Sequence, residues 1–245
     1  MHVLITRPEP DSAVWRAHLE ARGITVSSDA MLQIAEEPPA CLDLTGVQAL
    51  IATSRNSLRW LGACPNLSAV QGLPIYTVGP GSTKAAAQLG FERAEEGAGT
   101  ARDLVALIAQ RSDPDHGALL HISGDRIAFD LAAALEPMGF VTQRRVVYHS
   151  RPAYQLRPST VAGIASGAID TVALLSPLSA DTFVRLAREA GLEQHHQRLV
   201  YVCLSENIAG RMRPLSPGKV VVAAQPNAEA VLALLEKLAV QRSAC

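Results

Sequence analysis

Residues 118–153, ALLHISGDRIAFDLAAALEPMGFVTQRRVVYHSRPA, contain the pattern that decides the fold. An apolar run at 118–122 predicts a buried strand, and a second strand is predicted at 140–147. Between them, apolar residues recur every three or four positions, which predicts a helix with one apolar face. These apolar positions are Ile127, Leu131, Leu135 and Met138. The stretch is therefore predicted to be a βαβ unit, in which a helix joins two parallel strands.

The polar turn Ser123–Arg126 joins the first of these strands to the predicted helix. It offers backbone N–H groups, a glycine and an arginine at a helix N-terminus, where the helix dipole favours negative charge. An anion-binding site is one interpretation of this turn. A βα turn without any ligand has the same composition and remains the alternative.

Composition narrows the class of protein. The chain has 245 residues, of which 48% are hydrophobic, and this length suits two domains of roughly 110–120 residues. The charges nearly cancel, with 22 Lys and Arg against 23 Asp and Glu, and no basic block occurs, which argues against nucleic-acid binding. The first residues, MHVLITRPEP, have too short an apolar run for a signal peptide, and no apolar stretch is long enough to span a membrane.

Cysteine and histidine positions do not predict a metal site. The four cysteines lie far apart and have no CxxC spacing, so we expect reduced, structural thiols and a cytosolic protein. They are Cys41, Cys64, Cys203 and Cys245. His195 and His196 lie in a polar segment and are predicted to be a solvent-exposed pair rather than metal ligands.

The βα pattern recurs along the chain. The segment IATSRNSLRWL aligns with LLSPLSADTFVRL, so that Ser54 matches Ser176 and Ser57 matches Ser179. This similarity indicates an internal duplication of a βα unit rather than a short repeat.

Two proline-containing segments without clear periodicity cross between the halves. We interpret them as connectors near residues 34–40 and 148–154, because five strands then fall on each side. The sequence thus predicts a discontinuous α/β domain formed by residues 1–34 and 154–245, and an inserted α/β domain at 40–148. Each is expected to be a parallel sheet flanked by helices, and the two are expected to face each other across a cleft.

Polar turns follow many of the predicted strands, and ligands of open α/β sheets bind at this edge. The sequence has no GxGxxG, no GxxxxGK[ST] and no GxSxG motif, so the usual dinucleotide, P-loop and serine-hydrolase sites are not predicted. Small residues, hydroxyls and backbone N–H groups at these turns favour a large anionic or polar ligand.

Several of these turns form an ordered set of motifs. They are Thr6-Arg7-Pro8, Thr53-Ser54-Arg55-Asn56-Ser57, Val78-Gly79 with Ser82-Thr83, Ser123-Gly124-Asp125-Arg126, Val147-Tyr148 before Arg151, Leu175-Ser176-Pro177, Ser205-Glu206-Asn207-Ile208-Ala209 and Pro226-Asn227-Ala228. In this order and spacing the chain resembles the uroporphyrinogen-III synthase family over nearly its whole length. One departure is Leu204, where many relatives have glycine.

The resemblance implies two α/β domains joined by a two-stranded connector. It also implies a lyase that converts hydroxymethylbilane, a linear tetrapyrrole, into uroporphyrinogen III with ring D inverted and water lost. No metal or organic cofactor is expected. The implied protein is a cytoplasmic monomer, and hydroxymethylbilane synthase is the expected supplier of its substrate.

Site residues also follow from the resemblance. Tyr148 matches the family tyrosine proposed to assist departure of the hydroxyl group, and a phenol is protonated at pH 7. The implied substrate-binding residues are Arg7, Thr53, Ser54, Gly79, Ser82, Thr83, Ser123, Gly124, Arg126, Ser176, Ser179, Ser205 and Asn207. Arg7 and Arg126 have an alternative role, because they could pair with the neighbouring acids Glu9 and Asp125.

Two other classes of function remain open. One is a catalytically inactive, two-domain ligand-binding or regulatory protein on the same scaffold. Another is a glycosyl-transfer enzyme with two nucleotide-binding halves, although the expected phosphate loop is missing. A tyrosine at position 148 favours the synthase over the pure binding protein.

Overall fold

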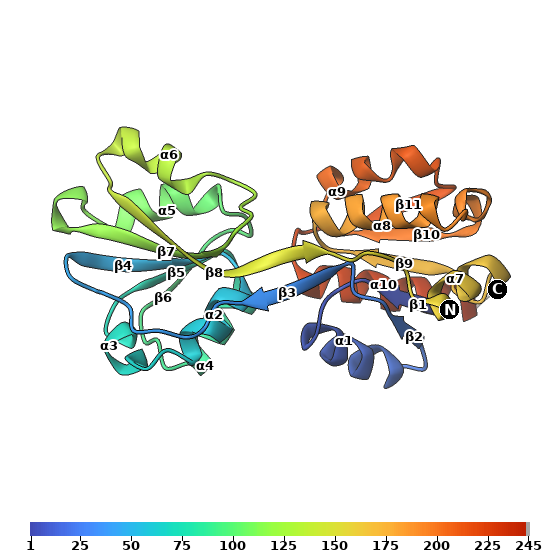
Figure 1. Ribbon diagram of the computed structural model, residues 1–245, viewed down its shortest axis with the longest axis horizontal. Coiled ribbons are helices and arrows are strands. Elements are labelled where there is room, and N and C mark those ends of the chain that lie inside the picture. The colour runs from blue at the N-terminus through green and yellow to red at the C-terminus, as the bar shows by residue number, and fades with distance from the viewer. Residues whose placement is uncertain (244–245) are drawn as a thin grey trace. The chain divides into compact units, whose positions relative to one another are not determined.

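The computed structural model describes residues 1–243 of the chain, which divide into two compact units. Unit 1 comprises Met1–Gln33 and the chain from Arg151 onward, and unit 2 comprises Ile34–Ser150. Each unit is a sheet with helices on both faces (Figure 1).

Unit 1 contains a five-stranded sheet in the order β11-β10-β9-β1-β2. Its strands are β1 (His2–Ile5), β2 (Thr25–Ser28), β9 (Thr171–Leu174), β10 (Val200–Cys203) and β11 (Lys219–Val222). All neighbouring strands are parallel. The central strands are buried almost throughout, as expected for a parallel sheet that is covered on both faces.

The helices of unit 1 cover the sheet with their apolar faces. They are α1 (Asp11–Glu20), α7 (Pro158–Ser166), α8 (Pro177–Glu189), α9 (Glu206–Arg211) and α10 (Ala228–Ser243), with 3₁₀ turns η3 (Glu193–Arg198) and η4 (Arg213–Leu215). One face packs on α7, α8 and α9, for example through Phe183 and Ile208. The other packs on α1 and α10, through Trp15 and Leu235. Two separate hydrophobic layers therefore hold unit 1 together.

Unit 2 contains a sheet in the order β3-β8-β7-β4-β5-β6. Its strands are β3 (Leu32–Glu36), β4 (Val47–Ala52), β5 (Ile75–Thr77), β6 (Ala94–Glu96), β7 (Ala118–Gly124) and β8 (Thr142–Pro152). The pairs from β8 through β7, β4 and β5 to β6 are parallel. Strands β3 and β8 each continue from one unit into the other.

The helices of unit 2 also form two layers. They are α2 (Arg55–Gly62), α3 (Leu67–Gln71), α4 (Pro80–Gln88), α5 (Asp103–Arg111) and α6 (Leu131–Leu135), with 3₁₀ turns η1 (Pro114–His116) and η2 (Glu136–Met138). One face packs on α2, α3 and α4, with Trp60 fully buried. The other face packs on α5 and α6, through Ile108 and Leu135. The predicted α/β class with parallel sheets flanked by helices is confirmed.

The helix predicted from residue 127 begins later in the structure. Asp130 caps α6 by accepting a hydrogen bond from the Ala133 N–H at 3.1 Å, so the helix starts at Leu131. The two outer positions of the predicted apolar face, Ile127 and Met138, are 37% and 47% exposed. The Ser123–Arg126 turn therefore does not lie at a helix N-terminus, and the expected dipole contribution there is wrong.

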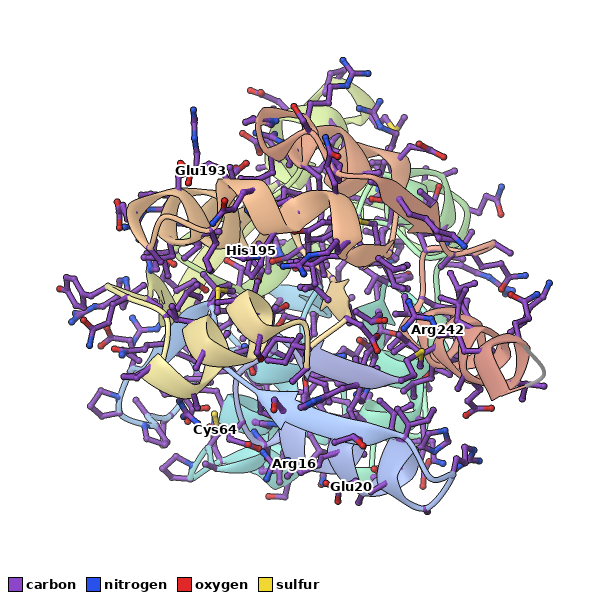
Figure 2. The ribbon with its side chains drawn as sticks, turned by 90° about the vertical axis from the view of Figure 1, so that its right-hand side faces the viewer. Arg16, Glu20, Cys64, Glu193, His195 and Arg242 are labelled. Atoms are coloured by element: carbon purple, nitrogen blue, oxygen red, sulfur yellow. The ribbon has the colours of Figure 1, made fainter. Side chains whose placement is uncertain are left out.

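His196 is buried, against the prediction of a solvent-exposed pair. It lies in η3, whose Glu193 and His195 are labelled in Figure 2. Successive residues of a 3₁₀ turn point about 120° apart, so neighbouring side chains can meet different surroundings. The His196 ring is fully buried and forms a hydrogen bond with the Tyr201 hydroxyl through Nδ1.

The cysteines of the described residues are free thiols. Burial raises the pKa of Cys64 to about 11 and that of Cys203 to about 12, so both stay protonated and unreactive near neutral pH. Cys64 is labelled in Figure 2, and Cys41 is exposed. Cys245 lies outside the described residues.

Candidate functional site

In each unit the strand order reverses near the middle of the sheet, and in unit 2 the strand β3 is added at the edge beside β8. In unit 2 the reversal lies between β4 and β7, and in unit 1 it lies between β1 and β9. Connections on the two sides of such a point leave in opposite directions, which opens a crevice at the carboxyl ends of the two strands. These carboxyl ends are therefore the places where the fold itself favours a ligand.

The unit 2 switch point combines Tyr148 with the ends of β4 and β7. Tyr148 lies on β8 and is 8% exposed. A Cβ atom built on Gly124 would lie 2.5 Å from Cε2 and Cζ of Tyr148, so only glycine allows the ring this close to the end of β7. Ser54, which follows β4, lies within reach of the Tyr148 phenol and lowers its pKa. The phenol is thus held against both central strand ends.

Burial raises the pKa of Tyr148 above its usual value. Hydrogen bonds from Ser54 and from the Gly124 backbone, together with the Arg144 charge, oppose this rise, whereas the Asp125 charge adds to it. The Ser54 oxygen already accepts a hydrogen bond from the Asn56 N–H at 3.2 Å, so its own proton is available to the phenol oxygen. The phenol therefore stays protonated at pH 7 and can donate a hydrogen bond.

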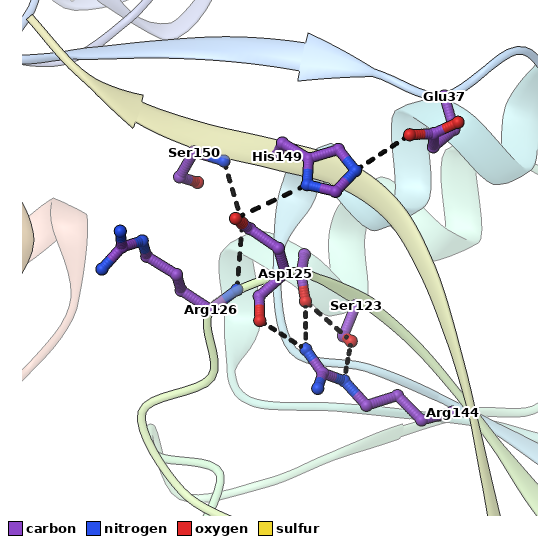
Figure 3. Close-up of polar contacts among 8 residues, drawn as sticks. Glu37, Ser123, Asp125, Arg126, Arg144, His149 and Ser150 are labelled. Carbon is purple, nitrogen blue, oxygen red and sulfur yellow. Dashed lines mark hydrogen bonds and ion pairs between the residues drawn. The ribbon is translucent and has the colours of Figure 1, made fainter.

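Asp125 connects the loop after β7 to the strand that carries Tyr148 (Figure 3). Its Oδ1 accepts hydrogen bonds from the backbone N–H groups of Ser150, at 2.9 Å, and Arg126, at 3.0 Å. Burial alone would raise the pKa of Asp125, but these two N–H groups and His149 lower it overall. Its own N–H donates to the Tyr148 carbonyl at 2.9 Å. The loop and β8 are therefore held in one register around the tyrosine.

His149 lies between two carboxylates. Its Nε2 is 2.9 Å from Glu37 Oε1, and its Nδ1 is 3.5 Å from Asp125 Oδ2 (Figure 3). Glu37 directly follows β3, and its N–H donates to the Val147 carbonyl at 2.9 Å. The three side chains link β3, β8 and the β7 loop.

Arg144 holds the same loop from another side. Its Nε donates to Ser123 Oγ at 2.8 Å, and its Nη2 donates to the carbonyls of Gly124 and Asp125, the latter at 2.9 Å. In Figure 3 the guanidinium points at the turn of backbone that ends β7. Because the guanidinium fork is planar, it fixes three oxygen atoms relative to one another.

The structure places the other predicted residues of unit 2 near β5 and in the β7 loop. Gly79, Ser82 and Thr83 form the start of α4, directly after β5. Thr83 Oγ1 bonds Thr77 Oγ1 at 2.7 Å and the Gly79 carbonyl at 3.1 Å, so this hydroxyl is used within the fold. Arg126 is exposed, and Figure 3 shows its guanidinium pointing away from the Asp125 carboxylate.

In unit 1 the predicted residues follow β1, β9 and β10. Arg7 forms an ion pair with Asp11 and lies over the Trp15 ring, with 5.3 Å to the ring centroid. Its neighbour Glu9 instead accepts a hydrogen bond from the Ala13 N–H at 2.9 Å. Asp11 is thus an acid paired with Arg7.

The serines of unit 1 define the starts of two helices. Ser176 caps α8 by accepting a hydrogen bond from the Ser179 N–H at 3.1 Å, and the two hydroxyls lie 2.7 Å apart. Ser205 occupies the corresponding place before α9, without a side-chain cap bond, and Asn207 lies in the first turn. These residues all lie at the carboxyl edge of one parallel sheet.

Residues 13–233 match the family model described as uroporphyrinogen-III synthase HemD. The match covers well over half of the sequence. The chain belongs to the uroporphyrinogen-III synthase family. The family resemblance of the turn motifs is therefore confirmed, and the family places the chain among proteins of porphyrin biosynthesis.

Solved structures of uroporphyrinogen-III synthases share the fold. The Helicobacter pylori protein aligns with a TM-score of 0.63 and 17% identity, covering 97% of this chain and 99% of that chain. A mutant of the Thermus thermophilus protein aligns with a TM-score of 0.59 and 16% identity, covering 99% of each. A search of curated protein sequences gave no match.

Residues 1–243 contain neither a cluster of potential metal ligands nor a helix that could span a membrane. This part of the chain has no group of three or more His, Cys, Asp and Glu side chains arranged to hold a metal ion. Within the same residues, every helix is too short or too polar to cross a membrane.

Sequence reasoning missed four side chains that organise this family member's unit 2 switch point. They are Glu37, His121, Arg144 and His149. Glu37 and His149 lie 112 positions apart, and His121 is bonded to a residue 68 positions away. The only local signal was that His149 directly follows Tyr148. Glu37, His121 and Arg144 are brought together by the pairing of strands that lie far apart in the sequence. No short sequence motif encodes that pairing.

Proposed function

We propose that the protein is an active uroporphyrinogen-III synthase, which closes hydroxymethylbilane to uroporphyrinogen III with inversion of ring D and loss of water. The observation that carries the proposal is Tyr148, a buried, protonated phenol held against Gly124 and Ser54 at the switch point of unit 2. Membership of the family supports this choice of substrate and reaction.

The chemistry requires departure of the terminal hydroxyl group. The electron-rich pyrrole pushes electrons toward the hydroxymethyl carbon, the carbon–oxygen bond breaks, and the oxygen leaves as water once it has gained a proton. The α-carbon of ring D that already carries a methylene bridge attacks that carbon and forms the spiro intermediate. The bond from this α-carbon to its original bridge then breaks, the freed bridge carbon bonds the other α-carbon of ring D, and the proton lost there balances the one taken up. The net reaction is redox-neutral, so it needs no electron carrier.

Tyr148 would donate a hydrogen bond to the leaving oxygen. Its raised pKa makes it a weak acid, so its contribution is a positioned hydrogen bond that strengthens as negative charge develops on that oxygen. Ser54 and the Gly124 N–H would donate to the phenol oxygen, which would leave the phenol proton for the substrate.

We further propose that the predicted residues at the two sheet edges bind the substrate's carboxylates. In unit 2 these would be Thr53, Gly79, Ser82 and Arg126, because Ser54 and Gly124 are directed at the Tyr148 phenol. The hydroxyls of Ser123 and Thr83 already donate within the fold, so these two residues would contribute to the shape of the site. In unit 1 the carboxylate-binding residues would be Arg7, Ser176, Ser179, Ser205 and Asn207. Hydroxyls and backbone N–H groups suit carboxylates because they donate hydrogen bonds. The enzyme would then hold the linear chain so that unassisted ring closure is outcompeted.

The test is a coupled assay with freshly made hydroxymethylbilane, followed by oxidation and separation of the uroporphyrin isomers. The unassisted reaction gives the type I isomer, so type III above the blank reports the enzyme. Tyr148→Phe should lower kcat for type III about 100-fold. Tyr76→Phe is the matched control, because Tyr76 is a similarly buried tyrosine of unit 2 whose hydroxyl bonds Ser112 instead.

The isomer assay distinguishes the role of Tyr148 from the function of the protein. Type III production that Tyr148→Phe leaves unchanged would keep the synthase and remove Tyr148 from its mechanism. Only type I from the folded protein would overturn the proposal and favour a binding or regulatory protein.

A further inference from the structure

His121 is a buried titratable residue on the central strand β7. Its side chain is 3% exposed. It shares a face of the sheet with its register partners, Ile51 on β4 and Arg144 on β8, because paired residues of parallel strands point the same way. Apolar side chains of the same layer include Leu119 and Leu131. An aliphatic side chain could fill this place without the cost of burying a polar ring.

The imidazole is neutral at pH 7. Burial, and to a smaller extent the nearby Arg144 charge, lower the pKa of His121 to about 4, although the Asp130 charge opposes both. A neutral imidazole has one nitrogen that donates and one that accepts a hydrogen bond. The tautomer therefore decides what His121 does to its neighbour.

That neighbour is Thr53. The His121 Nε2 lies 3.2 Å from Thr53 Oγ1. Thr53 directly follows β4, at the switch point of unit 2, and is partly exposed. A threonine hydroxyl has one proton to donate and two lone pairs. If Nε2 accepted the Thr53 proton, Thr53 would present only lone pairs to a ligand, and a carboxylate would be repelled.

We propose that His121 is a positioning residue whose Nε2–H donates to Thr53 Oγ1, which leaves the Thr53 hydroxyl proton to donate to a carboxylate of the bound tetrapyrrole. The nature of the ligand and the choice of tautomer rest on the proposed function, whereas the contact between His121 and Thr53 does not. His121 thus acts on binding through Thr53, without touching the ligand.

Three variants of the full chain test this role. His121→Met keeps an unbranched side chain of similar volume but has no donor, whereas His121→Gln carries an amide N–H at a comparable distance from the backbone. Thr53→Val removes the hydroxyl and keeps the shape. His121→Met should raise KM for hydroxymethylbilane about tenfold and change kcat less than threefold, and His121→Gln should restore KM to within threefold. His121→Met should add little further in the Thr53→Val background.

Two measurements test the role of His121 without relying on enzyme activity. In ¹⁵N-labelled protein, the His121 ring signals, identified by their loss in His121→Gln, should show a proton on Nε2 and should shift in Thr53→Val. Uroporphyrin III, an octacarboxylate, should bind about tenfold more weakly to His121→Met by fluorescence titration, and with near wild-type affinity to His121→Gln.

The outcomes separate this inference from the proposed function. A wild-type protein that makes no type III isomer would refute the function, while the tautomer and porphyrin binding would still decide the role of His121. A proton on Nδ1 with a bare Nε2 would overturn the inference even in an active enzyme. Wild-type KM and porphyrin affinity in a folded His121→Met protein would overturn it as well.

Discussion

Gly124→Ala offers a direct test of how the structure holds Tyr148. The new methyl group would lie 2.5 Å from Cε2 and Cζ of the tyrosine and 2.9 Å from its hydroxyl oxygen. An ordinary contact begins at 3.4 Å, so the ring must move by about 0.9 Å or the end of β7 must open by that amount. Tyr148 is 8% exposed, which leaves little room for either movement.

Two effects should follow from this overlap. Overpacking of this size lowers the free energy of unfolding by about 1–3 kcal/mol. A displacement of about 1 Å at a reacting group lowers kcat about 100-fold. KM should change much less, because the proposed hydrogen bond to the leaving oxygen develops in the transition state.

Urea unfolding and the type III isomer assay on the same preparation measure both effects. Gly210→Ala in α9 is the control, because nothing lies within 4 Å of its added methyl group and alanine favours a helix. A Gly124→Ala protein with wild-type stability and wild-type kcat would refute the packing of Tyr148 against Gly124. Loss of stability with unchanged kcat would keep the packing and refute the need for a fixed phenol.

Two further predictions concern stability. The folded-state pKa of His121 is lowered to about 4 from an ordinary value of 6.5, so its contribution is fully present above pH 6.5 and is lost as pH falls toward 4. Between pH 7 and pH 5 this costs about 2 kcal/mol, and urea unfolding of His121→Gln should show a pH difference smaller by that amount; equal differences in both proteins would contradict the burial of a neutral ring. Ser176→Ala removes the side-chain cap of α8 and should cost about 1 kcal/mol, whereas Ser205→Ala, which removes no cap bond, should cost less than about 0.5 kcal/mol. Equal losses in these two variants, measured by thermal unfolding, would argue against the cap.

The confirmed parts of the sequence prediction come from local periodicity and capping chemistry. Continuous apolar runs predicted the buried parallel strands, as at 118–122 within β7. The aligned serines Ser54 and Ser176 both cap helices, with nearly the same extended backbone conformation, because a short side-chain oxygen can bond the N–H groups of the next turn. Such interactions span three or four residues and can be read along the chain.

Local signals failed where tertiary contacts competed with them. The apolar spacing from Ile127 predicted a helix. Instead, the backbone at the end of β7 forms hydrogen bonds with β8 and with the Arg144 side chain. The helix therefore begins only after Asp130, whose side chain caps it. The segment near residues 34–40 showed no clear periodicity of its own, and only the family resemblance implied a strand there, yet β3 extends into it and is hydrogen-bonded to β8. Partners far away in the sequence decided both elements.

By itself the sequence determined the α/β class, the family and the turns that follow each strand, because these depend on residue type and short-range spacing. Only the tertiary structure decided which side chains surround Tyr148. Strand order brings β4, β7 and β8 together, and the register of these parallel strands sets Gly124 against the phenol and Arg144 beside His121. Parallel neighbours are joined by long crossovers, so contacts between them span tens of residues and leave no motif in the chain.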